Sequence, residues 1–200
     1  MMRPMRYLTR FLFLLGGLCL LKASYIPAKK GVGDILIERA WRLSQASGKP
    51  VHPWPWMDTV PLARLSVPKL GDSEIILNSS SGQALAFAPG HLPQTAKPGQ
   101  SGLSVIAAHK NTHFDFLEHV EIGDIIEVEN LNGDVTRYKT TSLDIIDKND
   151  FEVDLNTHEN QAKIALVTCY PFSRYSYGGP LRYIVHGEAI PESSLPQTGK

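Results

Sequence analysis

Three residues of types used in acyl-transfer chemistry stand at the ends of apolar segments. Cys169 follows the run "IALVT", His109 follows "SVIAA", and Arg182 lies near the start of a further run in "GGPLRYIV". A thiol can attack a carbonyl carbon if a second group moves protons and a third stabilises the oxyanion of the tetrahedral intermediate. Histidine moves protons at neutral pH, and arginine keeps its charge as a fixed donor. The three residues are therefore candidates for nucleophile, proton shuttle and oxyanion or substrate donor.

The sequence has one other cysteine, Cys19, which lies in an apolar N-terminal run. Exported proteins that use cysteine structurally normally use it in pairs, and a cysteine within a membrane segment cannot bridge to Cys169. An unpaired thiol at the end of a strand is either a reactive nucleophile or an inert buried side chain. Cys169 by itself leaves both readings open.

Residues 1–24 have the layout of an export signal or membrane anchor. Arg3, Arg6 and Arg10 precede the uncharged apolar run Phe11–Leu21, and a basic end followed by such a run directs export. No small-x-small cleavage site follows cleanly. We therefore expect an uncleaved, single-pass anchor in the inner membrane, with its basic end in the cytoplasm and the rest of the chain on the periplasmic side.

Residues 25–61 are expected to form a juxtamembrane helix and a stalk. Apolar residues recur at helical spacing in "GDILIERAWRLSQASGKP", and Gly48 and Pro50 are expected to end this amphipathic helix. The next stretch, "VHPWPWMDTVP", is rich in proline and tryptophan, which disfavours regular structure. We expect the segment to lift the following domain off the membrane, with Trp54 and Trp56 packed against that domain's side.

Residues 62–190 read as an all-β domain. Short segments rich in Val, Ile, Tyr and Thr are separated by clusters of Gly, Pro, Asn and Asp, as in "SEIILN", "LSVIAAH", "DIIEVEN", "KIALVT" and "LRYIVHGEAI". Asn132-Gly133 predicts a two-residue hairpin turn. The run "IALV" is apolar at every position, which predicts a central strand buried on both faces. Cys169 then lies where a rigid core strand ends and a loop begins.

Composition and motifs exclude several classes. With 20 basic and 20 acidic residues among 200, and a pI near 7.1, the chain has no electrostatic support for a nucleic-acid partner. Its sequence contains no GxGxxG, Walker or His-Glu-x-x-His motif. The remaining histidines lack metal-site spacing, so neither a cofactor nor a metal is expected.

The residues around the three candidates resemble sortases. "LVTCYPF" is similar to the sortase signature Thr-Leu-x-Thr-Cys, "GHLPQTAKPGQSGLSVIAAHKNTHF" to the stretch leading into the sortase histidine, and "GGPLRYIV" to the strand with the sortase arginine. The resemblance covers about Met57–Ile190, and it is greatest to the sortases of marine Gram-negative bacteria, the class called GN. Departures are Ala165 at the signature's first threonine, and Ala108 and Lys110 beside the histidine, where Gly and Arg are commoner.

The resemblance implies a transpeptidase acting on a protein that bears an LPxTG-like C-terminal signal. Cys169 would attack the Thr-Gly peptide bond, His109 would supply the proton chemistry, and Arg182 would hold the substrate or oxyanion. An amine of unknown identity, or water, would resolve the thioacyl enzyme. His113, four residues beyond His109, is the rival for the histidine role. Other exported cysteine peptidases or amidases, and a non-catalytic β-domain that binds envelope proteins, stay open as alternatives.

The expected architecture is a closed barrel of roughly eight strands with short helices, two of them over Phe114–Val120 and Asn156–Gln161. The strands that end in His109 and Cys169 would form the floor of a cleft. Its walls would be the loops Lys148–Ala162 and Tyr170–Leu181, with "SRYSYGG" as a lid. An apolar groove suits a leucine-proline substrate. The predicted substrate-binding residues are those around the thiol: Thr168, Tyr170, Pro171 and Phe172.

The pattern LPxTG also occurs in the chain itself. The tail 191–200 contains "LPQTGK", Leu195–Lys200, but no hydrophobic span follows it as in a working sorting signal. A tag, a self-processing site, a tethered pseudosubstrate and coincidence all stay open for it. The similar "LPQTA", Leu92–Ala96, matches a loop of the sortases themselves and is read as structure.

Overall fold

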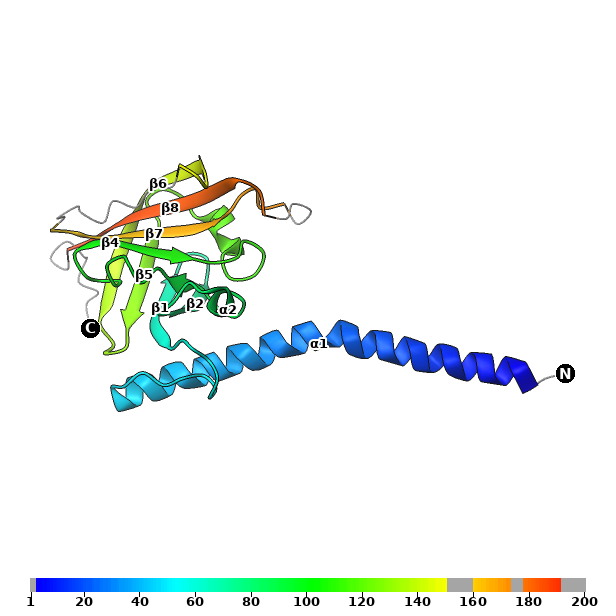
Figure 1. Cartoon of the computed structure of the whole chain (residues 1–200). Coiled ribbons are helices and arrows are strands. Elements are labelled where there is room, and N and C mark those ends of the chain that lie inside the picture. The colour runs from blue at the N-terminus through cyan, green and yellow to red at the C-terminus, as the bar shows by residue number, and fades with distance from the viewer. Residues whose placement is uncertain (1–2, 151–159, 174–177, 192–200) are drawn as a thin grey trace.

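The structure, a computed structural model, describes residues 3–150, 160–173 and 178–191. Eight strands close into a barrel, as the sequence predicted, and their order around it is β1-β2-β3-β4-β7-β8-β6-β5 (Figure 1). Helix α1 precedes the barrel, and α2 and the 3-10 helix η1 lie between strands. The bounds are α1 Arg3–Ser47, β1 Pro61–Val67, β2 Asp72–Leu77, α2 Gly82–Leu85, β3 Gly90–His91, β4 Gly102–Ala107, η1 Asp115–His119, β5 Ile125–Asn130, β6 Val135–Asp147, β7 Ala162–Cys169 and β8 Leu181–Ala189.

Strand β7 is buried on both faces, as its unbroken apolar run predicted. Ile164 and Leu166 belong to the main core inside the barrel. Ala165 and Val167 point the other way and pack in a second cluster with Ile184 of β8, since successive side chains on a strand alternate between faces. Both packing layers hold β7 rigid up to its last residue, Cys169.

The order of the central strands decides which loops meet. Strand β4 runs parallel to β7, and their last paired residues are Ala107 and Val167. Strand β8 runs antiparallel to β7 and begins where β7 ends. The loop after β4, the end of β7 and the start of β8 therefore lie at one edge of the barrel.

The hairpin between β5 and β6 differs from the prediction. The amide of Asn130 donates to the carbonyl of Asp134 at 2.9 Å, so three residues, not two, separate the paired strands. Gly133 has a φ of +88°, and no residue other than glycine has a positive φ among the described residues. A two-residue type I′ turn would need a positive φ at Asn132 as well. The three-residue loop needs a positive φ only at Gly133.

Helix α1 is one continuous helix whose second half packs on the barrel. Ile37 and Trp41 are buried with Ile75 and Leu77 of β2. Arg64 of β1 forms an ion pair with Glu38 at 2.8 Å. The apolar face of this half of the helix is therefore covered by β2 and α2, a contact that the sequence did not predict, while its role as part of a stalk stays a prediction. The helix ends before Gly48, whose φ is +65°, as predicted.

On either side of the packed half of α1, the chain is partly exposed or lies apart from the barrel (Figure 1). Residues 51–60 form no helix or strand, and Trp54 packs edge-on against Phe87, with ring centroids 5.0 Å apart, while Trp56 is 77% exposed. The first half of α1 projects away from the barrel (Figure 1). Within residues 3–150, 160–173 and 178–191, no helix has the length and apolar character needed to cross a membrane. The predicted membrane anchor stays a prediction.

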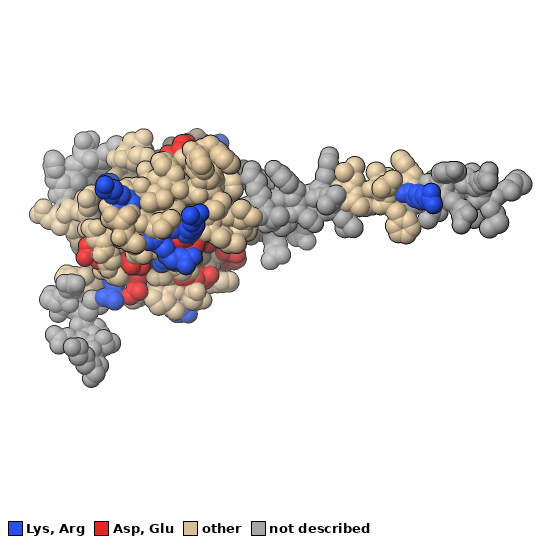
Figure 2. All heavy atoms as spheres, turned by 90° about the horizontal axis from the view of Figure 1, so that it is seen from below, with Lys and Arg blue, Asp and Glu red and all other residues tan. Residues whose placement is uncertain are grey.

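The charged residues are mixed on the face shown in Figure 2. Acidic and basic side chains lie next to one another there, in keeping with the formal net charge of zero.

The predicted helix over Phe114–Val120 corresponds to η1. Most of the second predicted helix, Asn156–Gln161, and most of the predicted lid fall in 151–159 and 174–177, outside the described residues.

Candidate active site

Cys169 and Arg182 are direct register partners at the end of the β7–β8 pair. His109 stands two residues beyond the end of β4, the parallel neighbour of β7 on its other side. The three residues predicted to do chemistry thus come from three adjacent strands at one edge of the barrel. Cys169 is a free, half-buried thiol, which a ligand at this edge can reach.

His109 is an exposed residue between two buried neighbours. Ala108 is 7% exposed and Lys110 is 5% exposed. The amide of Ala108 donates to Val167 O at 3.2 Å, and the amide of Phe114 donates to His109 O at 3.1 Å. The backbone around His109 is therefore fixed while its imidazole faces solvent.

Thr168 helps to hold this backbone. Its side chain is 2% exposed, and its hydroxyl donates to Ala108 O at 2.8 Å. This bond joins the residue before Cys169 to the residue before His109. The buried position favours a positioning role over the substrate contact predicted from the sequence, because the one hydroxyl proton is already used.

His113, the rival histidine, lies in a different environment. It is 5% exposed, and its Nδ1 lies 3.0 Å from a carboxylate oxygen of Glu74 on β2. A buried imidazole bonded to a carboxylate ties the loop after β4 to the barrel wall. Of the two histidines, His109 is therefore the one exposed to solvent, and His113 is buried against the barrel wall.

Arg182 is anchored by its own loop. Its Nη1 donates to Gly179 O and to Leu181 O, both at 2.9 Å. Leu181 O also accepts from the amide of Tyr170 at 3.0 Å, which joins the start of β8 to the residue after Cys169. The described residues offer the other two guanidinium nitrogens no hydrogen bond, so these can donate to a bound anion or carbonyl.

Aromatic side chains form the surface beside the thiol. Tyr170 and Phe172 contact each other and Tyr183 of β8, with ring centroids 5.2–6.2 Å apart. Burial raises the pKa of Tyr183 above its ordinary value, and electrostatic interactions with Tyr170 and Glu118 raise it further, so its phenol resists ionisation. Pro171 is exposed between the first two rings. The predicted residues Tyr170, Pro171 and Phe172 thus provide an apolar surface next to Cys169.

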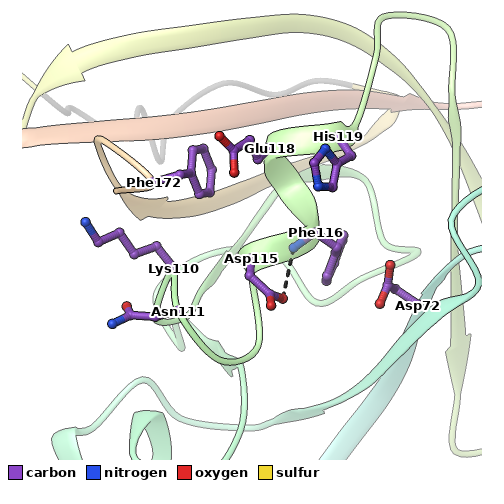
Figure 3. A pocket seen from close by; sticks show the side chains of 8 residues that line it. All are labelled: Asp72, Lys110, Asn111, Asp115, Phe116, Glu118, His119 and Phe172. Carbon is purple, nitrogen blue, oxygen red and sulfur yellow. Dashed lines mark hydrogen bonds between the residues drawn. The ribbon is translucent and has the colours of Figure 1, made fainter. Parts of the chain in front are cut away.

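A cavity of about 710 Å³ adjoins this surface (Figure 3). Its walls come from the first residue of β2, the loop after β4, η1 and the loop after β7. Three of its side chains are carboxylates. It is lined by Asp72, Lys110, Asn111, Asp115, Phe116, Glu118, His119 and Phe172. Of these, the sequence had singled out only Phe172 as a site residue; the position of Lys110 directly after His109 was the available signal for a second.

The LPxT sequence at Leu92–Thr95 lies within the folded domain. "LPQTA", Leu92–Ala96, is a folded turn in which Thr95 N donates to Leu92 O at 3.0 Å, so it is structure, as expected. The tail 192–200 with "LPQTGK" lies outside the described residues. Within the described ranges, no three His, Cys, Asp or Glu side chains gather as a metal site would require.

Comparison with known proteins identifies the family of the chain. A family model described as a sortase domain matches residues 65–190. A pilus-related sortase C of Group B Streptococcus is 27% identical, with a TM-score of 0.57, over 66% of this chain and 69% of that chain. Sortase C-1 of Actinomyces oris gives 27% identity and a TM-score of 0.57 over 66% of this chain and 73% of that chain.

A more complete overlap is found with a sortase D5 transpeptidase of Clostridium perfringens. It covers 81% of this chain and 98% of that chain, with a TM-score of 0.60 and 20% identity, which shows a shared fold. The comparison with curated proteins returns no match.

Proposed function

Because this chain belongs to the sortase family, we propose that it is a cysteine transpeptidase that cleaves an LPxTG-like signal between Thr and Gly. The acyl group would pass through a thioester on Cys169 to an amine. The observation that carries the proposal is the register pairing of Cys169 with Arg182, with His109 at the end of the adjacent strand.

The chemistry divides among the three residues. The Cys169 sulfur attacks the carbonyl carbon of the substrate threonine, and its proton passes to His109. Arg182 donates hydrogen bonds to the oxyanion, which is where preorganised donors contribute most. His109 then protonates the glycine nitrogen, the intermediate collapses with cleavage of the C–N bond, the glycine amine leaves, and a thioester remains on Cys169.

The second half-reaction reverses these roles. An amine attacks the thioester carbonyl, His109 accepts the proton from the attacking nitrogen, and the Cys169 sulfur departs and recovers its proton. The product is a new amide between the threonine carbonyl and the acceptor. Water in place of the amine would give hydrolysis.

We assign the two substrates to the two surfaces beside the thiol. The aromatic surface of Tyr170, Phe172 and Tyr183 suits the leucine and proline of the sorting signal. The cavity of Figure 3 suits the acceptor, because Lys110 follows His109 and Phe172 lies three residues beyond Cys169. Its carboxylates Asp72, Asp115 and Glu118 would favour an acceptor of positive charge.

We further propose that α1 anchors the enzyme in the inner membrane, with the barrel on the periplasmic side. The support is the basic N-terminal sequence and the exposed apolar side chains of Phe11, Leu12, Phe13, Leu14, Leu15 and Leu18. Basic residues before an apolar helix favour a cytoplasmic N-terminus.

The test is intact-mass spectrometry of the full chain in detergent, incubated with an LPQTG-containing peptide with and without triglycine. The wild type is expected to gain a thioester with that peptide, and triglycine to release the transpeptidation product. Cys169→Ala should do neither. Loss of Gly199-Lys200 from the wild type alone would make the tail a substrate too. A wild type that never forms a thioester with the separate peptide would refute the proposal.

A further inference from the structure

We propose that Lys110 is a positioning residue that sets the placement of His109 relative to Cys169 by binding the loop after the thiol. The inference rests on the proposed function, in that the reaction it serves is the transpeptidation. It assigns a role to a residue at which this sequence departs from the commoner arginine.

The Lys110 side chain crosses from the histidine loop to the thiol loop. Its Nζ donates to the carbonyl of Pro171 and, at 3.2 Å, to the carbonyl of Ser173. The residue is 5% exposed. Lysine is almost never buried to this extent without partners, because removing an ammonium group from water is costly unless acceptors replace that water.

The chemistry of the contact suits a fixed link. An ammonium group has three donors, and hydrogen bonds from a charged donor are stronger than neutral ones. Pro171 and Ser173 follow Cys169 by two and four residues, and Lys110 directly follows His109. The link therefore joins the segments immediately beyond the two reacting groups.

A second link lies on the other side of those groups. The hydroxyl of Thr168 donates to Ala108 O at 2.8 Å, which joins the residues immediately before Cys169 and His109. His109 and Cys169 thus each lie between two cross-links that connect the same pair of segments. Releasing one link would let the two segments separate beyond the reacting residues while their strands stayed paired.

The same contact shapes the cavity wall. Phe172 lies between the two carbonyls that Lys110 binds, and Figure 3 shows Lys110 and Phe172 on the same side of the cavity. Displacement of a reacting group by about 1 Å can reduce a rate by about 100-fold. Loss of the Lys110 contact should therefore reduce kcat more than it weakens peptide binding.

The test compares Lys110→Met, Lys110→Arg and Lys163→Met in the full-length enzyme. Lys163 is a matched control because it lies on β7 at the end remote from Cys169 and pairs with Glu188 at 3.5 Å. We expect Lys110→Met to lower kcat at least about tenfold and change KM for the peptide less than about threefold, with Lys110→Arg recovering most of kcat. If Lys110→Met does not fold by circular dichroism, Lys110→Gln, which keeps an N–H donor, is measured in its place.

A readout without substrate separates this inference from the proposed function. Alkylation of Cys169 by iodoacetamide is followed against pH in the wild type, His109→Ala and the Lys110 variants. We expect the Lys110→Met profile to move towards that of His109→Ala, while Lys163→Met matches the wild type. If the wild type forms no thioester but this shift occurs, the transpeptidase proposal fails and the positioning role stands. The inference would be overturned if the alkylation profiles of the wild type and Lys110→Met coincided. It would also be overturned if Lys110→Met and Lys163→Met changed the profile or kcat equally.

Discussion

Cys169 and Arg182 face each other across the last pair of the β7–β8 ladder. Because the ladder sets their spacing, the guanidinium stays at the end of the barrel where the thiol ends its strand. The carbonyls of Gly179 and Leu181, which precede it in the chain, bind one of its nitrogens. This relationship makes Arg182 a fixed donor beside the nucleophile, and removal of the guanidinium should lower kcat.

Arg182→Ala is expected to lower kcat by about 10²–10³-fold, the usual cost of removing an oxyanion donor. Arg182→Lys should recover little, because a single ammonium cannot bind its loop and a substrate oxygen in the same fork geometry. Steady-state transpeptidation of an LPxTG peptide measures both. Wild-type kcat in Arg182→Lys would show that charge alone suffices.

His109→Ala and His113→Ala should separate activity from stability. The exposed His109 is expected to be essential for turnover and nearly neutral for the free energy of unfolding. Removal of His113 leaves the Glu74 carboxylate without its buried partner and should cost about 1–3 kcal/mol while turnover of the folded fraction persists. Urea unfolding and kcat per folded enzyme give the comparison. The reverse pattern would make His113 the proton shuttle.

Thr168→Val tests the link between β7 and the histidine segment. Valine has nearly the same shape but no hydroxyl, so the buried Ala108 carbonyl would lose its donor, at a cost of about 1–3 kcal/mol. We expect a lower midpoint of thermal unfolding and a reduced kcat. Thr168→Ser keeps the donor and should resemble the wild type. A raised peptide KM with unchanged kcat would instead support the substrate contact predicted from the sequence.

Glu118→Gln tests the charge of the cavity. The substitution removes one exposed carboxylate and should raise KM for a cationic amine acceptor by about two- to fivefold, as expected for an exposed charge pair. KM for the LPxTG peptide should not change. The difference between wild type and Glu118→Gln should vanish at about 1 M salt, where charges are screened over about 3 Å. If wild type and Glu118→Gln had equal KM values for the acceptor at low salt, the amine would bind outside this cavity.

His91 should make stability depend on pH. Burial lowers its pKa below 6.5, opposed by its hydrogen bond to Ala96 O at 2.9 Å. The unfolded chain then binds a proton that the folded chain does not, so stability is complete above pH 6.5 and falls as the pH decreases below it. The thermal midpoint should decline from pH 7.5 to 5.5, and less steeply in His91→Gln, which keeps a donor for Ala96. Equal slopes would assign the decline to other groups.

Local patterns were sufficient where the property depends on neighbours in the sequence. The apolar run before Cys169 predicted a strand buried on both faces, and Gly48 ended α1 as expected. The hairpin at Asn132-Gly133 was found, but its loop length depended on which residue could adopt a positive φ within the paired strands. The packing of α1 on the barrel was not predicted, because the side chains that cover Trp41 come from β2 and from Arg64 of β1, which follow it in the chain.

By itself, the sequence determined the residue types available for catalysis, their order and their places at strand ends, because periodicity and turn signals are local. Tertiary structure alone decided that β4 lies parallel to β7 and that β8 brings Arg182 opposite Cys169. It also decided which histidine is buried against Glu74 and which faces solvent, and it brought Lys110 to the carbonyls beyond the thiol. These contacts join residues 39 to 61 positions apart, and such pairings depend on the closure of the barrel, which no local pattern encodes.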